Sequence, residues 1–598
     1  MTYRQHPHQQ SAALHKLVTE DAVGLLRGRA GKMAVLGSED GKLKLDWVEG
    51  IARLLADPDG LEAVENEARA LWEQGIRHII WAGMGGSIMA VRVLKQMGFG
   101  DASAETGITI YPLDSTDPAA LNTILQQIAQ AKQQPLTASN SELKTLLEDV
   151  MMVGVAMGMT SEEPITHLTW FTQLLEQAGL SPAAHLLVMT LPDSYLDRFA
   201  RAQHAPSRPL QLDGGTGTGG RMSAPATRVF LLPAALYLSR QGPTAGKLRQ
   251  VLSKAWNDHN LEQAMTQPAR HPFVQLAAAL ADTSSAGACR LLLNAPAPWD
   301  TLFSWIEQLM EESLGKGKQG VVIFQDQELN AQAADFQHTG TLRVVLSADT
   351  QPVTTTTHEE LPSFMLHQPY LASTNPLDRL AAVATCFLGW QLSMALYGYL
   401  QDITFAGQPA VEAYKAGARS LRNLPDPLQP LYSWPVTFSE GSLKLYAPLN
   451  VIEQATPAAV LASTLKRVRP AYLDCTINGE VFPELKDALA QIVFPLANRL
   501  LGIPAKLRQA PADYHSTEQS EMDGPPDLVS LRILFHQHEH IQLGTYSDTF
   551  LLAQAVSTWQ AMIGQNRQCF LLVIDGSAQQ AASQLTGYLR GVVQELRS

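Results

Sequence analysis

The stretch from His78 to Ala90, HIIWAGMGGSIMA, constrains the fold more than any other part of the chain. A short apolar run at 79–82 predicts a buried strand, and residues 88–97 have the pattern of a helix. The glycine-rich turn between them allows the backbone to approach a ligand, and the first N–H groups of the helix point toward it. An ordinary tight turn has the same pattern. As an anion site, the turn has the candidate residues Gly85, Gly86 and Ser87.

The alternation of strand and helix continues along the chain. Apolar runs at 108–111, 150–155 and 185–190 are each followed by a helical pattern. Such an order is typical of a parallel sheet covered by helices on both faces, with ligands at the carboxyl ends of the strands. A second unit of this kind begins near residue 290. After a proline-rich stretch at 424–435, interpreted as a linker, the remaining residues alternate again, with strands expected at 468–473, 530–535 and 569–574.

We therefore predict an α/β fold with several domains, because 598 residues are too many for one hydrophobic core. The expected order is a helical segment over 1–60, a first α/β domain over 61–285, a second over 286–425, and a C-terminal α/β region over 440–598. Within the first segment, the apolar residues from Leu14 to Leu26 predict one helix.

Composition excludes several classes of function. The formal net charge is −13 and no basic run occurs, which argues against a nucleic-acid partner. The N-terminus has no apolar signal core, and we find no uninterrupted apolar run of membrane-spanning length. The four cysteines form no C-x-x-C pair and no zinc spacing, so we expect free buried thiols and no metal. These features predict a soluble, cytoplasmic protein.

Charged residues of three later segments are candidates for chemistry. The glycine-dense stretch 212–220 ends at Arg221, whose guanidinium suits an oxyanion or phosphate, although the stretch also reads as a flexible loop. Glu312 is expected near the carboxyl end of a helix over 299–313, where the helix dipole disfavours a carboxylate. That placement favours a functional role over a surface glutamate. Lys415, by itself, reads as an exposed helix lysine.

Six motifs occur in one order along the chain: GMGGS, DSTDP, a glycine/threonine turn with Glu162, GGR-x-S, ES-x-GK and QP-x-V-E-x-x-K. Together they resemble the glucose-6-phosphate isomerases, built from two sugar-isomerase (SIS) domains. The resemblance is greatest to the isomerase part of the bifunctional transaldolase/glucose-6-phosphate isomerases. It runs from about residue 75 to 420 and returns at Tyr514–Thr517.

The resemblance implies an aldose–ketose isomerase that interconverts glucose 6-phosphate and fructose 6-phosphate through a cis-enediol, a step of glycolysis and gluconeogenesis. It assigns Glu312 as the base, Arg221 to the enediolate, Lys415 to ring opening and substrate binding, and His515 as a possible acid or base in ring opening. No metal or redox cofactor is implied, and we expect a monomer or homodimer. The implied binding residues are Gly85, Gly86, Ser87, Gly158, Thr160, Ser161, Gly220 and Gln408.

The chain departs from the family pattern most clearly at the phosphate loop. Related sequences read Ser-Lys-Thr/Ser-Gly-Thr-Thr-x-Glu, whereas the aligned stretch, 155–162, reads VAMGMTSE. Methionine side chains cannot bind a phosphate, and each lost charge-assisted bond costs about 1.5–3 kcal/mol. Two further departures are Gln391, where relatives tend to carry glutamate, and Glu518, where they tend to carry glycine.

These departures leave several functions open. The protein is an ordinary isomerase with a reshaped phosphate pocket, an isomerase of a different or unphosphorylated sugar, or a non-catalytic sugar-phosphate-binding or regulatory protein on the same fold. A further alternative is a scaffold that uses 440–598 to dock a partner. We rank the isomerase first, because the residues for chemistry are retained better than those for phosphate.

Overall fold

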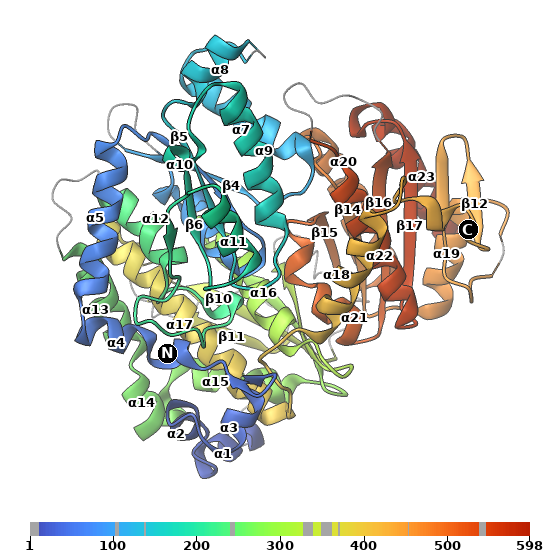
Figure 1. Ribbon diagram of the computed structural model, residues 1–598. Helices are drawn as coiled ribbons and strands as arrows, with labels where there is room; N and C mark the ends of the chain where they lie inside the picture. Colours follow the sequence, from blue (N-terminus) through green and yellow to red (C-terminus); the bar gives the residue numbers. More distant parts are fainter. Residues whose placement is uncertain are drawn as a thin grey trace.

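The computed structural model describes residues 11–101, 107–136, 139–239, 246–326, 339–347, 361–368, 371–452, 454–536 and 546–598. The fold is α/β, as the sequence predicts. Three sheets of five, four and six strands dominate these residues, each with helices packed on it (Figure 1). Residues 1–10, part of the expected N-terminal segment, lie outside the described ranges.

The first sheet contains β3–β7, all parallel, in the order β4-β3-β5-β6-β7. Its strands bury both faces. Ile80 packs with α7 and α9 on one face, while Ile79 and Trp81 pack with α5, α6 and α12 on the other. The elements are α5 (Asp59–Glu73), β3 (His78–Ala82), α6 (Met89–Leu94), β4 (Thr109–Leu113), α7 (Pro118–Ala131), α8 (Asn140–Leu147), β5 (Val150–Val155), α9 (Glu163–Gln177), α10 (Pro182–His185), β6 (Leu186–Met189), α11 (Tyr195–Ala202), β7 (Ser207–Arg208) and α12 (Arg228–Ser239).

The second sheet, also parallel, has the order β11-β10-β8-β9. Leu291 and Leu293 of β8 belong to the same core as α15 and α17, whereas Leu292 faces a core shared with α18 and the C-terminal region. The elements are α13 (Lys247–His259), α14 (Leu261–Thr266), α15 (Pro272–Thr283), β8 (Ala288–Asn294), α16 (Leu302–Leu314), β9 (Gly320–Gln325), β10 (Thr341–Ser347), β11 (Ser363–His367), α17 (Pro376–Gln401) and α18 (Pro409–Arg422).

Helix α17 differs from the expectation that no segment is apolar over a membrane-spanning length. Within the described part of the chain, it is the one helix long and apolar enough to cross a membrane. Its most apolar stretch is completely buried inside the protein. A helix that is apolar on all sides is expected where protein surrounds it. Here α13, α15 and α16 pack against it.

The C-terminal sheet has the order β12-β13-β17-β16-β14-β15, with β14–β17 parallel (Figure 1, orange to red). The predicted strand at 468–473 is wrong, because α19 continues to Val468 and the strand begins at Tyr472. The elements are β12 (Thr437–Glu440), β13 (Leu443–Tyr446), α19 (Pro457–Val468), β14 (Tyr472–Asn478), α20 (Pro483–Pro495), β15 (Ala505–Ala510), the 3₁₀ turn η10 (Tyr514–Ser516), α21 (Glu518–Asp523), β16 (Leu528–His536), α22 (Thr549–Gly564), β17 (Gln568–Asp575) and α23 (Ala578–Arg597).

The C-terminal region packs tightly on the second sheet. Helix α22 lies along α18, and α21 contacts α16. The proline-rich stretch between them is not a free linker, because Leu428 and Leu431 are buried in the core that both parts share. This packing carries loops of the C-terminal region to the helices that hold Glu312 and Lys415.

The N-terminal segment is helical but contains a hairpin that the sequence analysis did not predict. The single helix expected over Leu14–Leu26 is two, because Asp21 has a left-handed backbone (φ 48°) between them. The hairpin follows, with an Asp40-Gly41 turn joining its strands. The elements are α1 (Ala12–Thr19), α2 (Ala22–Arg27), α3 (Gly31–Leu36), β1 (Ser38–Glu39), β2 (Lys42–Leu43), the 3₁₀ turn η1 (Asp46–Glu49) and α4 (Gly50–Ala56).

Candidate active site

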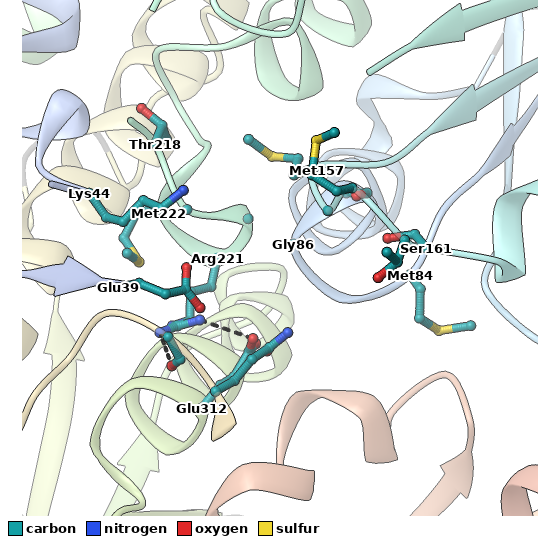
Figure 2. Close-up of a pocket in the computed structure, with 18 of the residues that line it drawn as sticks. Glu39, Lys44, Met84, Gly86, Met157, Ser161, Thr218, Arg221, Met222 and Glu312 are labelled. Carbon is teal, nitrogen blue, oxygen red and sulfur yellow. Dashed lines mark hydrogen bonds and ion pairs between the residues drawn. The ribbon is translucent and has the colours of Figure 1, made fainter. Parts of the chain in front are cut away.

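A pocket of about 420 Å³ lies at the carboxyl ends of β3 and β5, in the position expected of a ligand site in a parallel sheet. The turn after β3 and the loop after β5 form one side (Figure 2). The 3₁₀ turn η4 (Gly220–Met222) and α16 form another, and the loop before α18, α18 itself and η10 complete the lining. Segments from all three sheets therefore meet at one cavity.

Arg221 and Glu312 are buried side chains of the pocket lining. Together with Gln308 and the adjacent Ser313, they form what we call the inner wall. Arg221 Nη1 donates to Glu312 Oε1 at 3.1 Å, and both side chains are less than 8% exposed. Gln308 Nε2 donates to the other oxygen, Oε2, at 2.9 Å. Glu312 thus points into the cavity as a buried carboxylate held by two donors. The alternative of a surface glutamate is wrong.

The other two guanidinium nitrogens of Arg221 also donate to the protein. Nε donates to Ser313 Oγ at 2.7 Å, and Nη2 donates to the carbonyl oxygens of Phe405 and Gly407 at 2.7 and 2.9 Å. A guanidinium fixed in this way has a defined plane and cannot follow a ligand by rotating. The segment beyond Arg221 is also anchored, and this explains Gln391. Its amide donates to the carbonyl oxygens of Met222 and Ala224, which a carboxylate could not do.

Two glycines of the turn after β3 permit close packing of backbones. A Cβ added to Gly86 would overlap the backbone of Gly220, so any side chain there would displace the residue before Arg221. Gly85 has φ 53° and lies against Gln308 and His515, with 2.6 Å between an added Cβ and either side chain. Ser87 is buried and lines the cavity beside this turn.

The loop after β5, Met157–Ser161, forms the opposite side, which we call the loop wall. Met157 is half-buried and faces the cavity, while Gly158, Met159 and Thr160 are exposed (Figure 2). The wall offers the hydroxyls of Thr160 and Ser161 and the N–H groups that precede α9, but no cationic side chain. Its residues are thus suited to weak hydrogen bonding of an anion rather than to charge pairing.

The positions of two adjacent glutamates favour an alignment of this loop with the family motif that is shifted by one residue. Glu162, which the sequence analysis matched to the motif glutamate, points away and pairs with Arg419 and Arg422 at 2.9 and 2.8 Å. Glu163 instead is buried and lines the cavity. With Glu163 in the glutamate position, Thr160 and Ser161 fall on the two threonines, and Met157 falls on the lysine.

Lys415 points into a cluster of carboxylates without pairing closely to any of them in the described part of the chain. Burial alone lowers the pKa of its ammonium, but Glu163, Glu412, Glu518 and Glu312 outweigh it, so the pKa is raised. Conversely, burial raises the pKa of Glu163, whereas Lys415 and His515 hold it below its ordinary value. The site therefore keeps a charged ammonium next to a charged carboxylate.

His515 reaches the pocket from the C-terminal region. It stands on η10, between β15 and α21, and only 8% of it is exposed. Its Nδ1 lies 3.2 Å from Glu518 Oε2. Burial lowers the pKa of the imidazole, but Glu518 and Glu163 outweigh both this and the opposing charge of Lys415, so the pKa is raised.

Eleven of the twelve residues selected from the sequence line this one cavity, and the twelfth, Gly85, packs directly behind it against His515. The sequence analysis missed Glu163, Gln308 and the hairpin residues Glu39, Asp40, Lys42 and Lys44, which also line the pocket. The Asp-Gly turn was an available signal for the hairpin. Among the described residues, no group of three or more His, Cys, Asp or Glu side chains is placed to hold a metal ion.

Comparisons with known proteins agree with this architecture. No family model matches the chain. A glucose-6-phosphate isomerase from Prochlorococcus marinus (strain MIT 9313) is 24% identical over 404 residues, which cover 61% of this chain and 66% of that relative, just under two thirds of its length. The crystal structure of a hypothetical protein from Thermus thermophilus is 19% identical, with a TM-score of 0.49, and covers 69% of this chain and 99% of its own.

The crystal structure of a glucose-6-phosphate isomerase from Chlamydia trachomatis superposes with a TM-score of 0.51 at 14% identity. It covers 70% of this chain and 87% of its own. At that identity the likeness establishes the fold. In sequence and in fold, this chain is therefore similar to the glucose-6-phosphate isomerases.

Proposed function

We propose that this protein is a phosphosugar isomerase that interconverts glucose 6-phosphate and fructose 6-phosphate. The observation that carries the proposal is the convergence of Glu312, Arg221, Lys415 and His515 in one cavity. These residues come from separate segments of the chain, and nothing in their local sequence requires them to meet. The similarity to glucose-6-phosphate isomerases supports the substrate class.

The geometry is suited to proton transfer through an enediolate. Glu312 would take the proton from C2 of the open aldose while the C1 carbonyl oxygen gains the negative charge. The hydroxyl proton of O2 would pass to O1, and the protonated Glu312 would deliver its proton to C1 as the C2 carbonyl forms. The guanidinium of Arg221 is adjacent to the base and already fixed, so it can stabilise that charge without reorganising. A carboxylate buried in this way is shielded from water, which suits a weakly acidic C–H bond.

Lys415 and His515 are placed for the other oxygens of the sugar. Neighbouring carboxylates raise the pKa of both groups, which favours their charged forms, and both line the cavity. We assign them to substrate binding and ring opening. The phosphate would lie at the loop wall, on the hydroxyls of Thr160 and Ser161 and the amino end of α9.

A coupled assay for fructose 6-phosphate formation tests the proposal, run in deuterated water with product analysed by mass spectrometry. We expect turnover with deuterium incorporated at the transferred position, since an enediolate exchanges its proton with solvent through the base. Glu312→Gln, which keeps shape and both neighbouring donors but not the base, sets the background. Turnover of the wild type no higher than that background would reject the proposal.

The altered loop wall favours one alternative, a protein that binds sugar phosphates without converting them. Ligand-induced thermal stabilisation separates the two functions, because a bound ligand stabilises the native state whether or not it reacts. A shift of the melting temperature with glucose 6-phosphate and no turnover would support binding alone. Neither shift nor turnover would contradict both.

A further inference from the structure

Glu518 is a buried carboxylate beside the site, and none of the roles assigned so far accounts for it. It is the first residue of α21, only 2% of it is exposed, and it does not line the cavity. A buried carboxylate is costly unless a cation or a hydrogen-bond donor accompanies it.

The cationic partner that the structure provides is His515. Glu518 Oε2 lies 3.2 Å from His515 Nδ1, with 3% and 9% of the two side chains exposed. By hydrogen-bond geometry neither atom has a partner within the described ranges, so the contact between them is a close ion pair. The opposite edge of the imidazole faces the turn after β3, with 2.6 Å from an added Gly85 Cβ to Cδ2 and 3.1 Å to Nε2. Glu518 therefore lies at one edge of the ring, and Nε2 lies at the other, next to the turn whose Gly86 and Ser87 line the pocket.

Charges from every surrounding element act on this ring. Helix α18 contributes the ammonium of Lys415, which opposes a proton on His515, and α9 contributes Glu163, which favours it. Helix α16, which packs against η10, contributes Gln308 and Glu312 to the same cavity. The neighbours of the ring thus act in opposite directions.

Tyr414 of α18 is a further titratable neighbour of Glu518. Burial first, and then the charge of Glu518, raise the pKa of its hydroxyl. The tyrosine therefore stays neutral and adds no charge beside the carboxylate. Since Glu518 is the carboxylate in direct contact with His515, it decides the balance among the neighbours of the ring.

We propose that Glu518 is a positioning residue that holds His515 as an imidazolium with its Nε2–H directed into the pocket, as a fixed hydrogen-bond donor to an oxygen of the ligand. A neutral imidazole could instead present an acceptor at Nε2. The consequence for a sugar rests on the isomerase function proposed above. The pairing of Glu518 with His515 does not depend on that function.

Titration of His515 by NMR tests the pairing without turnover. In protein labelled at histidine, His515→Asn identifies the resonance, and its pH titration is compared between wild type, Glu518→Gln and Glu518→Asp. We expect the midpoint to fall by about one to three pH units in Glu518→Gln, because a charge within 4–6 Å has been removed. Glu518→Asp, which keeps the charge, should recover part of the fall. Glu484→Gln, an exposed change on α20, should leave the midpoint unchanged.

Stability provides a second readout. A histidine whose pKa is raised in the folded state contributes stability below its ordinary pKa and loses it as pH rises through the raised value. Wild type should therefore be more stable than Glu518→Gln at pH 6, and the advantage should vanish at alkaline pH, where a buried carboxylate faces a neutral ring. In the isomerase assay, the alkaline limb of kcat should move to lower pH in Glu518→Gln.

An unchanged midpoint of His515 in a folded Glu518→Gln variant would overturn the proposal, as would an equal change in Glu484→Gln. If no sugar phosphate is converted, the proposed function fails while the titration still decides whether Glu518 charges His515. If turnover occurs but the midpoint does not depend on Glu518, the proposed function stands and the role assigned to Glu518 fails.

Discussion

The two walls of the pocket are built in opposite ways. On the inner wall, Arg221 and Glu312 are buried, and each guanidinium nitrogen of Arg221 donates to the protein. On the loop wall, Gly158, Met159 and Thr160 are exposed, and Met157 stands in the place of a lysine. The inner wall belongs to packed helices, whereas the loop wall is a surface connection.

The two walls therefore differ in the amino-acid substitutions that they tolerate. Removing one partner of a buried ion pair costs several kcal/mol, so the inner wall cannot change without loss of stability. A surface loop tolerates substitution because few contacts depend on it. Retention of the residues for chemistry alongside loss of those for phosphate therefore follows from packing as well as from function. Three experiments can break or sharpen this comparison.

The largest effect is expected from the arginines. Arg221→Met leaves Glu312 and two carbonyl oxygens unpaired, so unfolding free energy should fall by about 3–5 kcal/mol. Turnover should fall about 10²–10³-fold, as on removal of an oxyanion donor. Arg419→Met removes a partly exposed partner of Glu162 and should cost less than about 1 kcal/mol. Urea unfolding and steady-state kinetics measure both, and equal losses would contradict the contrast between the walls.

An intermediate effect is expected at the junction of the turn after β3 with η4. Gly86→Ala places a methyl group on the Gly220 backbone and should cost about 1–3 kcal/mol, with lower turnover because Arg221 follows Gly220 directly. Gly587→Ala is the matched control, because an added Cβ there meets open space on helix α23. The control should be neutral or slightly stabilising. If chemical denaturation shows no change in unfolding free energy for Gly86→Ala, the backbone beside the inner wall can shift to accept the methyl group, contrary to this expectation.

The smallest effect concerns the loop wall and is a gain. Met157→Lys introduces a cation at the position that the shifted alignment matches to the family lysine. Affinity for glucose 6-phosphate should rise about tenfold, near the lower end expected for a charge-assisted bond at a half-exposed site. Met159→Lys adds the same charge at a residue that is 48% exposed and should gain less. Calorimetric titration compares them, and the opposite ranking would mean that Met157 does not face the anion.

Much of the fold could be predicted from local sequence. The strand at 150–155 and the helix after it follow from apolar runs and glycine turns, because these patterns report which residues a strand or helix buries. Boundaries were less certain where propensity is shared. Val468, the first residue assigned to a strand, is instead the last residue of α19, and the strand begins only at Tyr472.

The sequence by itself determined the α/β class, the order of the motifs and which charged residues to examine. Only the tertiary structure decided that Glu163 rather than Glu162 faces the pocket, that the Asp40-Gly41 hairpin reaches it, and that Glu518 lies against His515. Local periodicity records the burial of each element. Which side chains meet depends on how distant elements pack. The roles of the adjacent Glu162 and Glu163 can be distinguished only by the residues that this packing places next to each of them.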